Sequence, residues 1–273
     1  MGYKLLNEIF KTIIFPFRGL RLGKRYPVFW RVYEFFWKIS TGYRIFYHNV
    51  FDFKIIIDPN DKTFVLKNLI TYSMFDTYEP ETYKILKEHL NEGDIVLDIG
   101  ANIGLMSLIF SRIVGNKGRI YSFEPTKENF KYLCENKFLN DAKNIHPYNL
   151  AAWDKNEIVR MPKNSLQLEN VQWCNGVNIS DFLNKLGTNK VDFIKMDIDG
   201  AEPWAFRGLE KLIQMNPQIK MICEFYPKYI ESAEGDPDAF KNNLLKYFDI
   251  EIIHGDYGDG YWNYLCLPKT QKQ

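Results

Sequence analysis

From Gly93 onward, short apolar runs alternate with stretches whose apolar residues recur at helical spacing. Such an alternation of strands and helices predicts an α/β domain with a parallel sheet whose strands are joined by crossover helices. The last two expected strands, 251–254 and 261–267, resemble a β-hairpin instead. The earlier expected strands are 95–98, 119–123, 145–151, 191–196 and 220–225, and the clearest helices are 103–113, 127–138 and 237–248.

Two further helices and an insertion complete this predicted domain. Ser180 is expected to cap a short helix, because its hydroxyl can accept a bond from a free backbone N–H group. Pro203 is expected to open another helix at its first turn, where proline is favoured. Residues 154–176 lack a regular pattern, so an irregular insertion is predicted there.

Smaller elements are predicted before Gly93. Residues 44–58 indicate two short strands around His48 and Asn49, and helical spacing follows at 64–70 and again after Pro80. We therefore expect an N-terminal extension over 1–78, with helices and a β-hairpin. The α/β domain is expected over 79–273.

Charge is distributed unevenly along a chain whose net charge is only +1. Residues 1–44 hold nine basic and two acidic side chains, which gives nine minus two, or +7, and they are rich in aromatic rings. This composition suits a helix that lies on an anionic membrane surface. The alternative is an accessory helical layer packed on the main domain or on a second subunit, which leaves oligomer formation open.

The spacing of the cysteines and the hydropathy of the chain indicate the cell compartment in which the protein is expected. The four cysteines lie far apart without a CxxC pair, which predicts reduced thiols and neither a zinc site nor a disulfide framework. No apolar run is long enough to cross a membrane, and residues 1–17 lack a signal-peptide pattern. We expect a cytoplasmic protein, peripheral at the inner face of the membrane if residues 1–44 bind lipid.

The segment DIGANIG, residues 98–104, lies where a predicted strand turns directly into a helix. Its glycines allow a ligand close to the backbone, and the helix N-terminus offers N–H groups to a carboxylate. The glycines do not follow the GxGxxG order of a dinucleotide fingerprint. Glu124 ends the next strand, where a carboxylate can accept both hydroxyls of an adenosine ribose. Ala152 and Trp153 could wall the adenine ring, unless Trp153 simply packs in the core.

Three segments, VLDIGANIG, FEP and KMDIDGAE, together resemble the FkbM family of S-adenosylmethionine-dependent methyltransferases over roughly residues 79–225. The resemblance implies a Rossmann-like class I fold, with a seven-stranded sheet in the order 3-2-1-4-5-7-6, strand 7 antiparallel and helices on both faces. It also implies O-methylation of a sugar, glycan or sugar-decorated metabolite, and hence a role in glycan biosynthesis.

The positions that match the family's motifs indicate which residues of this chain would bind the cofactor. The resemblance implies that Glu124 holds the ribose, and Glu79 could reach the ammonium group or the acceptor. Where the family commonly has glutamate, this chain has Asp199, which shifts one contact. The methionine side of S-adenosylmethionine is expected at Asp98, Gly100, Ala101, Asn102 and Gly104.

Acidic residues after the fourth predicted strand are the catalytic candidates, because ligands bind beside the carboxyl ends of parallel strands. Methyl transfer from a sulfonium requires alignment of the acceptor and removal of a hydroxyl proton. Asp197 is the expected base and also borders the cofactor. Lys195, Glu202 and Glu224 complete the expected catalytic set.

Other interpretations of these residues stay open. Asp197, Asp199 and Glu202 could hold magnesium, but no histidine or asparagine completes the set, so a metal is not favoured. Alternatively, Asp199 lies in a turn and Glu202 caps the next helix. His254 is a second candidate base outside the expected set.

Two other functions compete with methylation of a sugar hydroxyl. In an RNA or protein methyltransferase, residues 1–44 would serve as a phosphate-binding arm. Residues 197–200, DIDG, lack the Pro-Pro-aromatic loop common in amino-group methyltransferases, so a nucleic-acid partner is disfavoured. The third reading is a non-catalytic scaffold protein that binds the cofactor without turnover.

Overall fold

The computed structural model describes residues 46–50, 52–57, 79–162, 171–256 and 260–269. The described residues belong to two compact units, one that ends at residue 78 and one that begins at Glu79. In the first unit, β1 (Phe46–Val50) pairs antiparallel with β2 (Phe53–Ile57). The predicted hairpin is therefore present, but its turn is not at His48 and Asn49. Both residues lie within β1, and Asp52, with φ of 66°, turns the chain instead. The expected helix at 64–70 lies outside the described residues.

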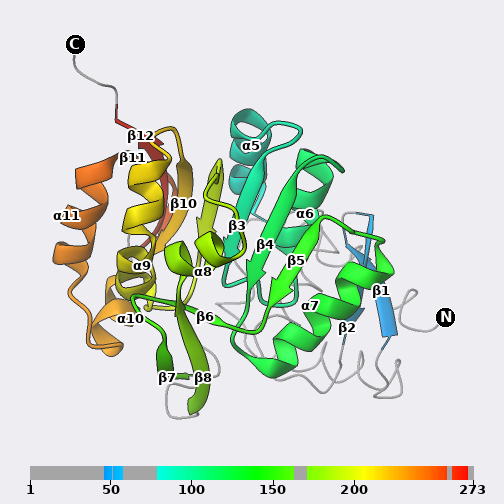
Figure 1. The fold of residues 1–273 in the computed structure, drawn as a ribbon, viewed down its shortest axis with the longest axis horizontal. Coiled ribbons are helices and arrows are strands. Elements are labelled where there is room, and N and C mark those ends of the chain that lie inside the picture. Colours follow the sequence, from blue (N-terminus) through cyan, green and yellow to red (C-terminus); the bar gives the residue numbers. More distant parts are fainter. Residues whose placement is uncertain (1–45, 51, 58–78, 163–170, 257–259, 270–273) are drawn as a thin grey trace, which may run out of the picture. The chain divides into compact units, whose positions relative to one another are not determined.

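A seven-stranded sheet forms the centre of the second unit, in the order β11-β12-β10-β9-β3-β4-β5 (Figure 1). Neighbouring strands from β5 to β10 are parallel, and β12 is antiparallel to both of its neighbours. This is the predicted order and orientation. The strands are β3 (Ile95–Ile99), β4 (Arg119–Phe123), β5 (Ile145–Tyr148), β9 (Phe193–Met196), β10 (Lys220–Phe225), β11 (Phe248–Asp256) and β12 (Tyr261–Pro268).

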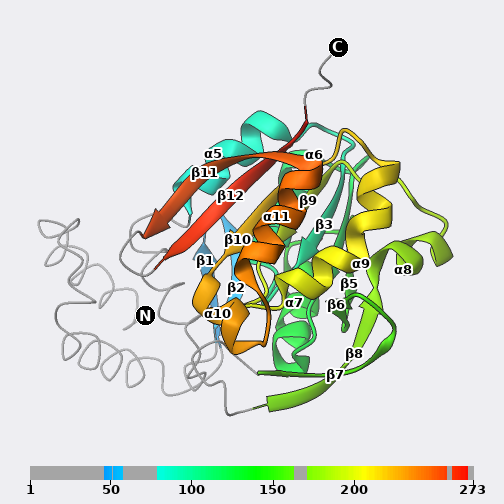
Figure 2. The same ribbon diagram turned by 90° about the vertical axis from the view of Figure 1, so that its left-hand side faces the viewer.

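Helices cover both faces of this sheet (Figures 1 and 2). Helices α6 and α7 pack together, whereas α9 packs against both α8 and α11. Because both faces are covered, β3 and β9 are buried along most of their length, and their residues are apolar apart from Asp98 and Lys195. The helices are α5 (Pro80–His89), α6 (Leu105–Val114), α7 (Lys127–Leu139), α8 (Ile179–Lys185), α9 (Glu202–Met215), α10 (Pro227–Ser232) and α11 (Pro237–Tyr247). None of the helices in the described ranges is long and apolar enough to cross a membrane.

A separate three-stranded sheet corrects two predictions. The expected strand 145–151 is divided, because β5 ends at Tyr148 and a new strand, β6 (Ala151–Trp153), joins the other sheet. The side chain of Asn149 donates to the carbonyls of Glu124 and Pro125 at 2.9 and 3.0 Å, and this turn takes the chain out of the main sheet. The insertion is also more regular than predicted, since β7 (Glu157–Pro162) and β8 (Val171–Asn178) form an antiparallel ribbon beside β6.

Helix ends in this unit follow local side-chain chemistry. The predicted cap at Ser180 is wrong, since Asn178 caps α8 by accepting from the Asp181 N–H group at 3.0 Å. Ser180 instead donates to the Gly208 carbonyl at 2.7 Å and so ties α8 to α9. Pro203 lies in the first turn of α9, as predicted, and α10 was not expected from the sequence.

Candidate functional site

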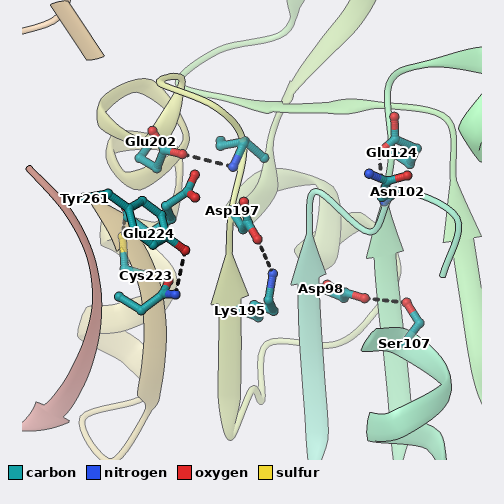
Figure 3. Close-up of polar contacts among 12 residues, drawn as sticks. Asp98, Asn102, Ser107, Glu124, Lys195, Asp197, Glu202, Cys223, Glu224 and Tyr261 are labelled. Atoms are coloured by element: carbon teal, nitrogen blue, oxygen red, sulfur yellow. Dashed lines mark hydrogen bonds and ion pairs between the residues drawn. The ribbon is translucent and has the colours of Figure 1, made fainter. Parts of the chain in front are cut away.

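The carboxyl ends of β3, β4, β9 and β10 lie side by side and carry most of the predicted site residues (Figure 3). Asp98 pairs in register with Lys195 of β9, and Asp197 directly follows that strand. Glu124 directly follows β4, and Glu224 is the penultimate residue of β10. The parallel topology therefore gathers side chains that are up to 126 positions apart in the sequence, from Asp98 to Glu224.

The glycine loop after β3 is fitted tightly to the neighbouring strands. Gly100 has φ of 87°, and a Cβ atom built on it would lie 1.9 Å from the carbonyl oxygen of Asp197. The N–H groups of Gly100 and Ala101 both donate to the Phe123 carbonyl at 3.0 Å. A Cβ on Gly104 would lie 2.5 Å from a methyl carbon of Leu133. The glycines are thus required by contacts within the protein, whereas the sequence interpretation gave contact with a ligand as their reason.

Glu124 fastens this loop to the start of α7. Its Oε2 accepts from the Asn102 N–H group at 2.9 Å, and its Oε1 accepts from the Thr126 N–H group at 2.8 Å. Burial raises the pKa of Glu124 to about 7, although these hydrogen bonds oppose the rise. The Asn129 amide also donates to Oε1, at 3.5 Å, and the Thr126 side chain bonds to the same carboxylate, so most of its roughly four acceptor positions are already used within the protein.

Asp98 is fully buried and incompletely paired. Its Oδ2 accepts from the Ser107 hydroxyl at 2.5 Å, while its Oδ1 has no hydrogen-bond partner among the described residues. Burial raises the pKa of Asp98 to about 6, against the opposing charge of Lys195. A buried acceptor without a partner fits a site that is completed by a ligand donor, and the sequence analysis expects the methionine side of the cofactor at this position.

A buried ion pair joins Lys195 to Asp197. The two side chains are 2.6 Å apart, with Lys195 6% and Asp197 36% exposed. Although burial opposes the charge on Lys195, the carboxylate of Asp197 and its neighbours raises the lysine pKa above its ordinary value. Burial alone would raise the pKa of Asp197, but Lys195 and a hydrogen bond from the Glu224 carboxyl hold that pKa below its ordinary value. Asp197 is therefore ionised at neutral pH.

Glu224 and Tyr261 border this pair on the β10 side (Figure 3). Burial and the charge of Asp197 raise the pKa of Glu224 well above its ordinary value, which favours the protonated form of its carboxyl group. Its buried Oε2 has no hydrogen-bond partner among the described residues. The Tyr261 hydroxyl accepts from the Asn263 amide at 2.9 Å. Sequence reasoning missed Tyr261, because only the antiparallel register of β12 brings it to this edge.

Glu202 has a different environment from that of Asp197. Its two carboxyl oxygens accept from the N–H groups of Ile198 and Gly200, both at 2.9 Å, and burial raises its pKa to about 8. Asp199, with φ of 54°, lies in the turn that Glu202 holds. These contacts favour a positioning role for Glu202, as in the turn-and-cap alternative. In the described part of the chain, no three His, Cys, Asp or Glu side chains are grouped to hold a metal ion.

The remaining candidate residues have different surroundings in the structure. Glu79 precedes α5, and its charge raises the pKa of Lys195, which places it near the ion pair. Ala152 lies in β6 and is buried in the hydrophobic core. Trp153 stacks on Trp204 with ring centroids 5.4 Å apart. His254 is exposed within β11. The roles of these residues in ligand binding stay predictions.

Comparisons with known proteins agree with this architecture. The profile of the FkbM methyltransferase domain matches residues 98–247. A tRNA (guanine(37)-N(1))-methyltransferase from Phaeodactylum tricornutum is 27% identical over 156 residues, which are 55% of this chain and 29% of the relative. The hexuronic acid methyltransferase AglP from Haloferax volcanii is 22% identical over 143 residues, which are 50% of this chain and 58% of the relative. The chain thus spans less than two thirds of either curated relative.

Solved structures with a similar arrangement include two methyltransferases. The O-methyltransferase from Bacillus cereus in complex with SAH has a TM-score of 0.48 and 14% identity, and the match covers 71% of this chain and 83% of that one. A SAM-dependent methyltransferase from Aquifex aeolicus has a TM-score of 0.47 and 20% identity, with 72% and 93% covered. The family profile covers more than half of the chain, and the sheet has the strand order expected of the family. This protein therefore belongs to the FkbM methyltransferase family, and its sheet has the strand order of the class I methyltransferase fold.

Proposed function

We propose that this enzyme methylates a hydroxyl oxygen of a sugar or glycan-type acceptor. The observation that carries the proposal is the state of Asp197, an ionised carboxylate 2.6 Å from Lys195 and beside Glu224, whose own pKa is raised by burial. A carboxylate of this kind accepts a hydrogen bond from an alcohol and then its proton. The sugar acceptor is supported by the family resemblance and by the similarity to AglP, a hexuronic acid methyltransferase.

The roles of the chain's own residues follow from their charges. S-adenosylmethionine, when bound, supplies an electrophilic methyl group on a sulfonium. Asp98, Gly100, Ala101, Asn102 and Gly104 would hold its methionine side, and Glu124 its ribose. Asp197 would orient the acceptor hydroxyl and take its proton as the new bond forms, while Lys195 keeps Asp197 ionised until then. Glu224 would donate its proton to a hydrogen bond with the acceptor or with Asp197.

A direct test combines cofactor binding with methyl transfer. We expect the full-length protein to bind S-adenosylhomocysteine with a dissociation constant between about 1 μM and 1 mM in a calorimetric titration. We also expect transfer of a labelled methyl group to at least one sugar in a panel of glycosides. A well-folded protein that binds no S-adenosylhomocysteine would contradict the cofactor assignment. Binding without transfer to any sugar would contradict the acceptor assignment.

Cofactor affinity should depend on pH through Glu124. Ribose hydroxyls donate to a carboxylate, so binding favours the ionised form of a group whose pKa is about 7 in the free protein. As the pH falls from 8 to 6, the protonated fraction rises, and we expect the affinity for S-adenosylhomocysteine to fall by up to about tenfold per pH unit below that pKa. Calorimetry on Glu124→Gln, which cannot ionise, is the control. If the affinity of this variant depended on pH as steeply, a group other than Glu124 would cause the pH dependence.

A second candidate acceptor is RNA, and two observations favour it. The tRNA methyltransferase from Phaeodactylum tricornutum shares 27% identity with this chain, and residues 1–44 carry the excess of seven positive charges that a phosphate-binding arm needs. Labelled methyl transfer to total tRNA, compared with transfer to the sugar panel, separates the two acceptors. Residues 1–44 lie outside the described residues, so membrane contact, subunit contact and localisation stay predictions.

A further inference from the structure

One face of β8 is turned toward Glu124, although β8 belongs to the three-stranded sheet and not to the main sheet. The Gln172 amide donates to the Thr126 hydroxyl at 2.8 Å. Burial, and then the charge of Glu124, raises the pKa of the Cys174 thiol. Gln172 and Cys174 are two positions apart and so share a face of the strand, whereas Trp173 between them is 68% exposed. The β7–β8 ribbon therefore contacts the expected ribose side of the cofactor site.

The direction of the hydrogen bonds from Gln172 to Glu124 follows from their chemistry. The Thr126 side chain bonds to the Glu124 carboxyl group and lowers its pKa, as a hydroxyl donor does. A hydroxyl group has a single proton to donate, so the Gln172 atom that faces Thr126 must be the donor nitrogen. The three side chains thus form a relay in which Gln172 donates to Thr126 and Thr126 donates to Glu124.

This relay bears on the orientation of the Glu124 carboxylate. A hydroxyl group can rotate between acceptors, but a donor held on its oxygen limits that rotation and strengthens the bond that the hydroxyl donates. The same carboxylate accepts from the N–H groups of Thr126 and Asn102, and weakly from the Asn129 amide. Because most of its acceptor positions are used within the protein, its orientation decides which position is left for a ligand.

We propose that Gln172 is a positioning residue for the ribose of the cofactor: through the Thr126 hydroxyl it holds the Glu124 carboxylate in the orientation that accepts a ribose hydroxyl. Gln172 acts on the cofactor through these two residues and not by direct contact. This inference rests on the cofactor role proposed for Glu124. It extends the cofactor site to a ribbon outside the seven-stranded sheet, within residues 154–176.

The first test follows the affinity for S-adenosylhomocysteine from about pH 6 to pH 9, by calorimetry on the full-length protein. Gln172→Leu removes the donor at similar side-chain size, so the Thr126 hydroxyl stabilises the ionised form of Glu124 less well. We expect the midpoint of the pH dependence to rise by about 0.5 unit, which weakens binding about threefold at pH 6 and less than about twofold at pH 9. An unchanged midpoint would overturn the positioning role.

Reversing the hydrogen bond gives a sharper variant. In Gln172→Glu the new carboxylate accepts from Thr126 and competes with Glu124 for its proton, so the midpoint should rise by about one unit or more. Gln214→Leu is the matched control, because the Gln214 amide also donates to a hydroxyl, that of Tyr247, at 3.2 Å. This bond joins α9 to α11, and its loss should leave the pH profile unchanged.

A double-variant cycle shows whether Gln172 acts through Thr126. Thr126→Val removes the hydroxyl at similar size, and in the described structure this side chain does not cap α7. The midpoint should rise in Thr126→Val, and adding Gln172→Leu should then move it by less than about 0.2 unit. A merely structural role for Gln172 would weaken binding equally at all pH values and add to the effect of Thr126→Val. Either result would overturn this inference.

The fate of the proposed function can be separated from that of this inference. If Glu124→Gln loses the pH dependence and Gln172→Leu keeps the wild-type profile, the inference fails and the proposed function stands. If Glu124→Gln keeps the wild-type profile, the ribose role of Glu124 and the positioning role of Gln172 fail together, while methyl transfer to sugars is unaffected. If the folded wild-type protein binds no S-adenosylhomocysteine, both the inference and the proposed function fail.

Discussion

Replacing Gly100 with alanine is expected to abolish binding of S-adenosylhomocysteine and to lower the free energy of unfolding by about 3 kcal/mol or more. The new Cβ atom would lie 1.9 Å from the carbonyl oxygen and 2.9 Å from the carbonyl carbon of Asp197. Both are backbone atoms, so no side-chain rotation relieves the contact. If the loop moved away, it would break the bonds from Gly100 and Ala101 to the Phe123 carbonyl. It would also move Asn102 from Glu124.

Gly187→Ala is the matched control for this prediction. Gly187 also has a left-handed backbone, with φ of 75°, but a Cβ atom there would have no neighbour within 4 Å. Only the backbone strain remains, which costs about 1 to 2 kcal/mol. Urea denaturation and calorimetry on both variants therefore separate strain from steric overlap. If Gly100→Ala binds S-adenosylhomocysteine as well as Gly187→Ala does, the glycine loop is not packed against Asp197 as described.

Strand prediction succeeded where a strand is buried on both faces and polar residues mark its ends. The predicted strand 220–225 has the same bounds as β10, because its centre, residues 221–223, is apolar and Pro227 then begins a new helix. Prediction failed between Tyr148 and Ala151. One strand was expected there, but the segment is divided between two strands that belong to different sheets. Hydrophobic spacing cannot reveal that division, since it depends on the side chain of Asn149 reaching the carbonyls of Glu124 and Pro125.

Some candidate site residues were predictable because parallel strands end at a common edge. Asp197 and Glu224 are predicted on this ground, whereas Asp98 and Glu124 are predicted from the glycine motif and the family resemblance. The structure brings all four to that edge. What each carboxyl group does could not be read from sequence, because protonation depends on burial and on partners far away in the chain. Tyr261 was missed for a related reason: its position also depends on residues far away in the chain, through the register of an antiparallel strand.

Asp197→Asn is expected to lower kcat by about 10²- to 10⁴-fold while changing the affinity for S-adenosylhomocysteine by less than about threefold. Asparagine keeps the shape of aspartate and can still accept a hydrogen bond from the acceptor, but it cannot take the proton. The change also leaves Lys195 without its 2.6 Å partner, so thermal unfolding must show that the variant is folded at the assay temperature. An unchanged kcat in a folded Asp197→Asn variant would remove Asp197 from the role of base.

Glu224→Gln distinguishes the two neighbouring carboxyl groups, because glutamine resembles a protonated glutamate. Its amide can still donate a hydrogen bond to Asp197, so we expect kcat to fall by only about tenfold or less. The pKa of Asp197 is held down partly by that donated bond, and the pH profile of kcat should keep its shape in the variant. Equal losses in both variants would mean that Glu224 must ionise during the reaction. A larger loss in Glu224→Gln would transfer the role of base from Asp197 to Glu224.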